Sequence, residues 1–233
     1  MQVVIGARAY ELSETLQSDE LAPIFADAWT ASRVWDASAF LSEHLVEFAA
    51  TQRHPFRMNP VSEEVFSSSS SSAAAAASVI ELGSGCGLAG LIAASLGGDV
   101  LLTDQRETVE LLQRNVAANA VSDDEFNRLK VQEFTWGSEP SKVLPRRTYD
   151  YILISDCINP IYGTESWRNL ARSILALSDA HTLTYLAHER RGDDEAMADF
   201  LAFSSSFLVH EKIATREKLS LFKISKRAQE GDR

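Results

Sequence analysis

A glycine-rich run near the middle of the chain has the composition of a loop that approaches a ligand closely. Its sequence is Glu81-Leu82-Gly83-Ser84-Gly85-Cys86-Gly87. Glycines after an apolar run let the backbone turn sharply and come near a ligand without a side-chain clash. Asp104 ends the next apolar run, and its carboxylate can accept both hydroxyl groups of a ribose. Together they predict a site for a cofactor that carries a nucleoside.

The spacing of the glycines narrows the cofactor class. A nicotinamide fingerprint is G-x-G-x-x-G, but here the sixth position is Leu88. The pattern is G-x-G-x-G with Glu81 two residues before the first glycine, which resembles motif I of S-adenosylmethionine-dependent methyltransferases. A dinucleotide and a ligand-free turn remain alternatives. Trp136 and Trp35 could flank such a cofactor, although ordinary core packing explains either tryptophan equally well.

The elements that must position this loop alternate along the chain. Apolar runs predict strands at 79–82, 100–104, 130–136, 149–155 and 182–189, helices between them, and a terminal hairpin at 207–214 and 218–225. Such alternation predicts a Rossmann-like α/β fold, a doubly wound and mainly parallel sheet of seven strands with a C-terminal antiparallel hairpin. Ligands of such sheets bind at the carboxyl ends of the strands.

A family resemblance follows from motifs in a fixed order. The motifs are VWDAS, FLSEHL, ELGSGCGLAGL, TDQRETVELLQRNV, FTWG, SDCI and HERR. In this order they resemble family-16 seven-strand class I methyltransferases. The similarity is greatest to the protein-lysine methyltransferase subgroup, which includes the enzyme that methylates the valosin-containing AAA ATPase. The resemblance covers the chain from about Arg33 to the C-terminal strands.

The resemblance implies roles for individual residues. S-adenosyl-L-methionine would be the cofactor, with Trp35 at its methionine end and Ser155 in contact from the end of the fourth strand. Glu189 would lie near the substrate entrance, or would simply pair with Arg190 or Arg191. The implied cofactor-binding set is Trp35, Glu81, Gly83, Ser84, Gly85, Asp104, Trp136 and Ser155, and the implied catalytic set is Asp156, Asn159 and Glu189.

The run SDCINPIYG, residues 155–163, fits two motifs that imply different substrates. Asn159-Pro160-Ile161-Tyr162 resembles the Asn-Pro-Pro-Tyr motif of amide and base methyltransferases. Asp156 instead begins an Asp-x-x-Tyr-like motif of lysine methyltransferases. Asp156 is the first acidic residue after the strand, whereas Asn159 lies about 10 Å further along an extended chain. We therefore assign Asp156 to the reaction centre and Asn-Pro to a turn.

The fourth position of that motif departs from the family pattern, because Asn159 stands where an aromatic residue is expected. Tyr162 or Trp167 could supply the ring from the following segment, or the amide oxygen of Asn159 could meet the amine. Loss of activity is a further alternative. We expect Asp156 to capture and orient a substrate ammonium, since a carboxylate raises the pKa of a neighbouring amine and is a poor base for it.

Composition limits the partners and the compartment. The 233 residues carry a net charge of -11 and no long basic cluster, which argues against a nucleic-acid partner. No apolar run is long enough to cross a membrane, and MQVVIGARAYELSE lacks the pattern of a secretory signal. Two cysteines, Cys86 and Cys157, make neither a disulfide framework nor a four-ligand zinc site. We expect a cytoplasmic or nuclear monomer without a metal.

One low-complexity segment divides the chain, because six serines precede five alanines at 67–77. We predict an N-terminal extension at 1–65 that packs on the catalytic domain, a flexible Ser/Ala-rich insertion at 66–78, the catalytic domain at 79–226 and a polar tail at 227–233.

The sequence favours a protein-lysine methyltransferase whose substrate is a protein such as a chaperone or an AAA ATPase. Two other functions remain open: a methyltransferase for a small-molecule or nucleic-acid nitrogen, and a non-catalytic module that binds the cofactor.

Overall fold

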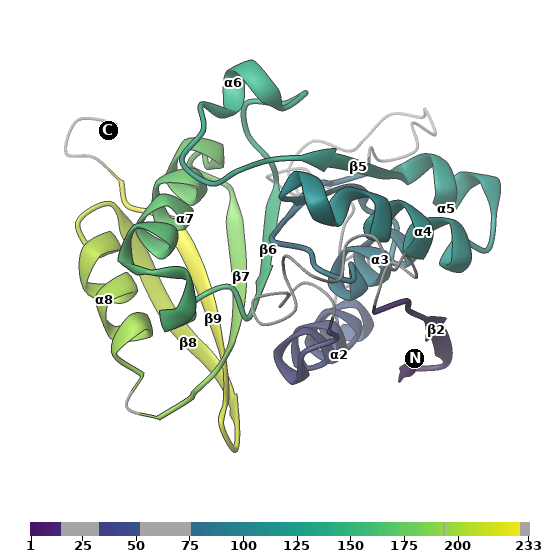
Figure 1. Ribbon diagram of the computed structural model, residues 1–233, viewed down its shortest axis with the longest axis horizontal. Helices are drawn as coiled ribbons and strands as arrows, with labels where there is room; N and C mark the ends of the chain where they lie inside the picture. Colours follow the sequence, from purple (N-terminus) through teal and green to yellow (C-terminus); the bar gives the residue numbers. More distant parts are fainter. Residues whose placement is uncertain (15–32, 52–75, 193, 229–233) are drawn as a thin grey trace, which may run out of the picture.

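The computed structural model describes residues 1–14, 33–51, 76–192 and 194–228 (Figure 1). Most of the predicted Ser/Ala-rich insertion and the end of the predicted polar tail lie outside the described residues. The elements are β1 (Gln2–Ile5), β2 (Arg8–Glu11), α2 (Asp36–Thr51), β3 (Ser78–Leu82), α3 (Leu88–Ser95), β4 (Asp99–Asp104), η2 (Arg106–Thr108), α4 (Val109–Asn119), α5 (Asp123–Arg128), β5 (Leu129–Glu133), α6 (Pro140–Val143), β6 (Tyr151–Ser155), η3 (Pro160–Tyr162), α7 (Thr164–Leu177), β7 (Leu183–Glu189), α8 (Glu195–Ser204), β8 (Leu208–Arg216) and β9 (Leu219–Lys226).

The main sheet has seven strands in the order β5-β4-β3-β6-β7-β9-β8. The strands from β5 to β7 pair in parallel, and β9 pairs antiparallel with both β7 and β8. The predicted fold class is therefore confirmed. After β5 the chain returns to the other side of β3, so the strand order reverses between β3 and β6. A ligand crevice is expected at the carboxyl ends of these two strands.

Two hydrophobic clusters cover the two faces of this sheet, as Figure 1 shows by the helices on either side. One cluster joins α2, α3 and α4 to the sheet through residues such as Leu41, Leu91 and Leu112. The other joins α7 and α8 through Leu170, Ile174 and Phe200. β3 is buried along its whole length. Burial on both faces explains why this strand reads as a continuous apolar run.

The strands and helices that the sequence predicted are present, with shifts at their ends. β5 ends at Glu133, so Trp136 lies in the loop after the strand rather than at its last position. The β1–β2 hairpin, α5 and α6 were not predicted. α5 is six polar-rich residues whose cap is Ser122, which accepts the N–H of Glu125 at 3.2 Å. Because α5 is too short to show a periodic apolar face, the sequence carries no helical signal for it.

The described parts of the predicted N-terminal extension pack on the catalytic domain. Tyr10 and Leu12 of the first segment and Leu45 of α2 belong to the same hydrophobic cluster as α3. Asn119 of α4 binds the hairpin backbone twice, accepting from the N–H of Glu11 at 2.8 Å and donating to its carbonyl at 2.7 Å. None of the described helices has the length and apolarity to cross a membrane.

Candidate active site

A cavity of about 570 Å³ opens where the loops after four parallel strands meet. It lies at the carboxyl ends of β3, β4, β5 and β6, beside the reversal of strand order. Its lining consists of residues 33–35, Ser38, residues 83–88, Asp104, Gln105, Glu107, Thr108, residues 134–136, residues 155–157, Tyr162, Ser166 and Asn169. Seven of the eight predicted cofactor-binding residues line it, and Glu81 does not. That these seven contact a cofactor stays a prediction.

Position 83 of the glycine loop requires glycine for two separate reasons. Its φ of +68° lies in the left-handed region that side chains disfavour. A Cβ there would also lie 2.6 Å from Sγ of Cys157 and 2.8 Å from the ring of Trp136. The absence of a side chain therefore lets the loop pack directly against two residues of the cavity wall.

Asp104 fixes the loop to the end of β4. Its Oδ2 accepts the N–H of Gly85 at 2.8 Å, and its Oδ1 accepts the N–H of Gln105 at 2.7 Å. Burial raises the pKa of the Asp104 carboxyl, whereas these two backbone donors act in the opposite direction. The result is an oriented carboxylate on the cavity wall with lone pairs that can accept ribose hydroxyl groups.

Glu81 lies behind the loop rather than in the cavity. Its side chain is fully buried, and Oε2 accepts the N–H of Gly90 on α3 at 3.0 Å. Oε1 has no hydrogen-bond partner among the described residues. Burial raises the pKa of Glu81 to about 8, so the group is mostly neutral at pH 7. Glu81 was predicted to contact the cofactor directly. The structure instead places it beneath the glycine loop and against α3, outside the cavity lining.

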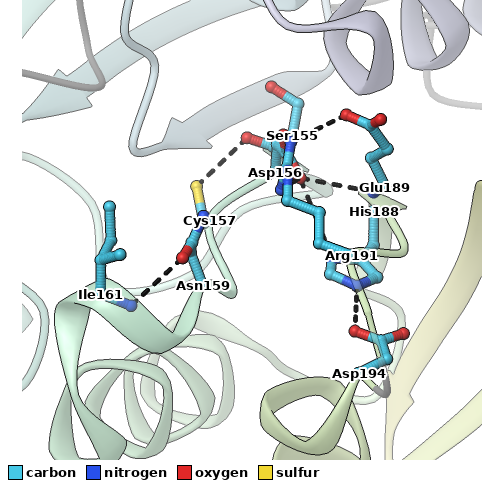
Figure 2. Close-up of polar contacts among 9 residues, drawn as sticks. All are labelled: Ser155, Asp156, Cys157, Asn159, Ile161, His188, Glu189, Arg191 and Asp194. Carbon is cyan, nitrogen blue, oxygen red and sulfur yellow. Dashed lines mark hydrogen bonds and ion pairs between the residues drawn. The ribbon is translucent and has the colours of Figure 1, made fainter.

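Asp156 sits where the sequence placed it, on the cavity wall directly after β6, but its partner differs from the prediction. Arg191 donates to both carboxylate oxygens, with Nη1 3.0 Å from Oδ1 and Nη2 in contact with Oδ2 (Figure 2). The Asp156 side chain is 1% exposed. A substrate ammonium cannot reach the carboxylate while Arg191 stays in place, so the predicted capture by Asp156 does not fit this geometry.

Asn159 does not line the cavity, which corrects its predicted catalytic position. Its Oδ1 accepts the N–H of Ile161 at 3.1 Å and caps η3, as Figure 2 shows. The turn that Asn-Pro predicted is therefore present. Tyr162 at the end of η3 does line the cavity, whereas Trp167 is buried and donates to Asp199 at 2.7 Å. Of the two proposed replacement rings, the structure places Tyr162 at the site.

Glu189 also lies outside the cavity lining. Its Oε2 accepts from Nη2 of Arg191 at 2.8 Å, the ion pair that was the simpler expectation for this residue. Sequence reasoning treated Arg191 only as that possible partner and missed its contacts with Asp156. The adjacent HERR run was the available signal, since a cation two residues after Glu189 can return to the same strand end. No group of three or more metal-ligating side chains occurs among the described residues.

The sequence of this chain matches a known protein family. Residues 26–206 match the model of a family described as lysine methyltransferase. The chain belongs to this lysine methyltransferase family. The match includes the glycine loop, Asp104, Asp156 and the strand end at Glu189. The predicted family resemblance is confirmed.

The chain is also similar to two known proteins and to one solved structure. It is 37% identical to protein N-lysine methyltransferase METTL21A of Xenopus tropicalis over 49% of this chain and 50% of that protein. The chain thus spans about half the length of that relative. It is 26% identical to EEF1A lysine methyltransferase 3 of the same organism over 86% of this chain and 77% of that protein. The glycopeptide N-methyltransferase MtfA complexed with sinefungin superposes with a TM-score of 0.53 at 12% identity, over 79% of this chain and 93% of that one, and shows the shared fold.

Proposed function

We propose that this chain is a protein-lysine N-methyltransferase that uses S-adenosyl-L-methionine. The observation that carries the proposal is one cavity with two different walls. The glycine loop and Asp104 form one wall, and Ser155, Asp156 and Tyr162 form the other. Membership of the lysine methyltransferase family supports this function over a methyltransferase for a small molecule or a nucleic acid.

The residues of the first wall fit the proposed cofactor. Asp104 would accept the ribose hydroxyl groups, and Gly83 and Gly85 would let the backbone approach the methionine portion. Trp136 and Phe134 offer apolar surface for adenine. When bound, S-adenosylmethionine supplies an electrophilic methyl group on a sulfonium, so the protein need only align an acceptor nitrogen and exclude water.

The second wall would receive the acceptor. A lysine ammonium must lose its proton first, which costs about 4.6 kcal/mol at pH 7 for an ordinary pKa of about 10.4. An apolar cavity lowers the pKa of an amine because burial disfavours the charged form. Tyr162 is positioned to cover the aliphatic part of the lysine.

The proposal is tested with labelled S-adenosylmethionine and a lysate from cells that lack this protein, followed by mass mapping of the labelled site. Label on lysine of a protein is the expected result. The variant Asp104→Asn serves as the background control, because it retains the shape of the site without the carboxylate. Label on arginine, RNA or a metabolite, or no label despite cofactor binding, would contradict the proposal.

We further propose that the acceptor is a chaperone or an AAA ATPase and that the enzyme acts as a cytoplasmic or nuclear monomer. The acceptor class rests on the family resemblance, and the compartment rests on the sparse cysteine content. Identification of the labelled protein, sedimentation of the purified chain and imaging of the tagged protein test the three statements separately.

A further inference from the structure

Arg191 makes three charged contacts at the end of β7. Its guanidinium donates to both oxygens of Asp156, and Nη2 also donates to Glu189 (Figure 2). The contact with Asp156 raises the pKa of Arg191, which stays charged. The carboxylate of Asp156 therefore already has a permanent cationic partner from its own chain. Removal of that partner would leave a buried carboxylate without compensation.

The same guanidinium makes a fourth contact, with Trp35. The central carbon of Arg191 lies 4.9 Å from the centroid of the Trp35 ring, and the central carbon of Arg33 lies at the same distance from it. Trp35 lines the cavity, whereas Arg191 does not. A planar guanidinium can bind a carboxylate with its edge and an aromatic ring with its face at the same time. Arg191 thus lies behind the wall of the cavity. It joins Trp35, from the N-terminal part of the chain, to Asp156 at the end of β6.

Described contacts hold the chain before and after Arg191. Gly192 and Asp194 both have a φ of +64°, in the left-handed region. Oδ1 of Asp194 lies 2.7 Å from Nε2 of the buried His188 on β7, as Figure 2 shows. The N–H of Arg190 donates to the carbonyl of Lys218 at 2.8 Å. These contacts hold the loop on either side of Arg191.

The backbone conformation at Asp156 also favours its contact with Arg191. Asp156 has a φ of +57°, a conformation that a residue other than glycine rarely adopts. Its N–H donates to the carbonyl of Ala187 at 2.9 Å, and its Oδ1 accepts the N–H of Glu189 at 3.3 Å. The unusual conformation turns the carboxylate toward the end of β7, where the guanidinium of Arg191 donates to it.

We propose that Arg191 is a positioning residue that joins Asp156 to Trp35 and thereby holds the Trp35 wall of the cofactor cavity in place. On this assignment Asp156 serves cofactor binding through Arg191 and does not capture the substrate ammonium. The inference rests on the proposed function for the identity of the cofactor.

The test measures binding of S-adenosylmethionine by calorimetry, without any acceptor protein. Arg191→Met should weaken binding about 10- to 30-fold, because the contacts with Asp156 and with Trp35 are both lost. Arg191→Lys keeps the charge but neither planar contact, and should fall between Arg191→Met and the unsubstituted chain. The matched control is Arg190→Met, at the exposed neighbouring arginine, and it should change the affinity less than about twofold.

Asp156→Asn should weaken cofactor binding in the same direction as Arg191→Met. The double variant Arg191→Met/Asp156→Asn leaves no unpaired buried charge, so it remains informative if either single variant unfolds. Its loss should be no larger than that of the worse single variant, since the two residues act as one unit. Thermal unfolding without the cofactor separates lost affinity from a lost fold.

Three results would overturn the inference. They are unchanged cofactor affinity in folded Arg191→Met, additive losses in the double variant, and an Asp156→Asn enzyme whose protein-substrate KM rises while cofactor affinity stays the same. The last result would return Asp156 to ammonium capture. If the unsubstituted chain does not bind S-adenosylmethionine, both proposals fail. Normal cofactor binding without lysine labelling contradicts the proposed function alone.

Discussion

The two walls of the cavity are built in different ways. Most of the wall of the glycine loop comes from one continuous stretch, from Gly83 to Thr108, and much of its geometry lies in the backbone. The opposite wall combines Trp35 with the ends of β6 and η3, and Arg191 supports it from the loop after β7. The first wall is readable from local sequence because its parts are neighbours. The second depends on side chains more than thirty residues apart.

The carboxylates of the two walls, Asp104 and Asp156, are also held in different ways. Asp104 is held by two backbone N–H groups, which fix its direction without neutralising its charge. Asp156 is held by the guanidinium of Arg191, which does neutralise it. The loop wall therefore keeps an anionic acceptor for a ligand, whereas the opposite wall uses its acidic group to hold the protein together. Four substitutions test this comparison.

Gly83→Ala should have the largest effect. A Cβ would contact Cys157 and Trp136 at a left-handed backbone position, so we expect cofactor affinity to fall on the order of 100-fold and stability by about 2 kcal/mol. Calorimetry and thermal unfolding measure both. Gly97→Ala is the matched control, because Gly97 also has a positive φ but has no atom within 4 Å of an added Cβ. Equal effects of the two substitutions would show that strain alone, and not the close approach, matters.

Glu81→Gln should change how stability depends on pH. The unfolded carboxyl titrates near 4.5 and the folded one near 8, so between these values the folded state holds one more proton. Stability of the unsubstituted chain therefore falls by about 1.4 kcal/mol per pH unit across this window from this group alone, and levels off above it. Glu81→Gln should lose that slope. Denaturant unfolding from pH 5 to 9 measures it.

The control for this experiment is Glu110→Gln on α4, where the side chain is 71% exposed. It should leave the slope unchanged. If Glu81→Gln also keeps the slope of the unsubstituted chain, the folded carboxyl is not neutral at pH 7.

Tyr162→Ala should affect binding of the protein substrate alone. Loss of the ring that lines the cavity should raise the KM for the protein substrate about 10-fold, while cofactor affinity stays within about twofold. Steady-state methylation at saturating cofactor measures the first quantity. Ile161→Ala is the matched control, since Ile161 is the more exposed neighbour on η3 and does not line the cavity. A fall in cofactor affinity with Tyr162→Ala would mean that Tyr162 contacts the cofactor and not the acceptor alone.

Asn159→Ala should have the smallest effect. It removes the cap of η3 and should cost about 1 kcal/mol of stability, with methyl transfer reduced less than about threefold. Thermal unfolding and the methylation rate measure these changes. A loss of rate as large as that of Gly83→Ala would show that the amide of Asn159 meets the reacting amine after all.

The sequence predicted the elements of the sheet and most of the cavity wall at the glycine loop, because strands and the glycine turn leave strong local patterns. The six polar-rich residues of α5 and the four-residue strands of the hairpin leave weak ones. Glu81 shows a different limit. Its place in the motif was readable, but whether it faces the cavity or α3 depends on Gly90, whose missing side chain lets the helix approach the carboxyl group.

For this protein the sequence alone determined the family, the parallel sheet with its antiparallel hairpin, and the position of the cavity at the strand ends. These follow from periodicity and from glycines, which act over a few residues. Tertiary structure alone decided the partner of Asp156, the position of Asn159 outside the cavity lining and the place of Tyr162. Each is a contact or placement set by how β6, η3 and the loop after β7 come together, and no local pattern encodes the distance between them.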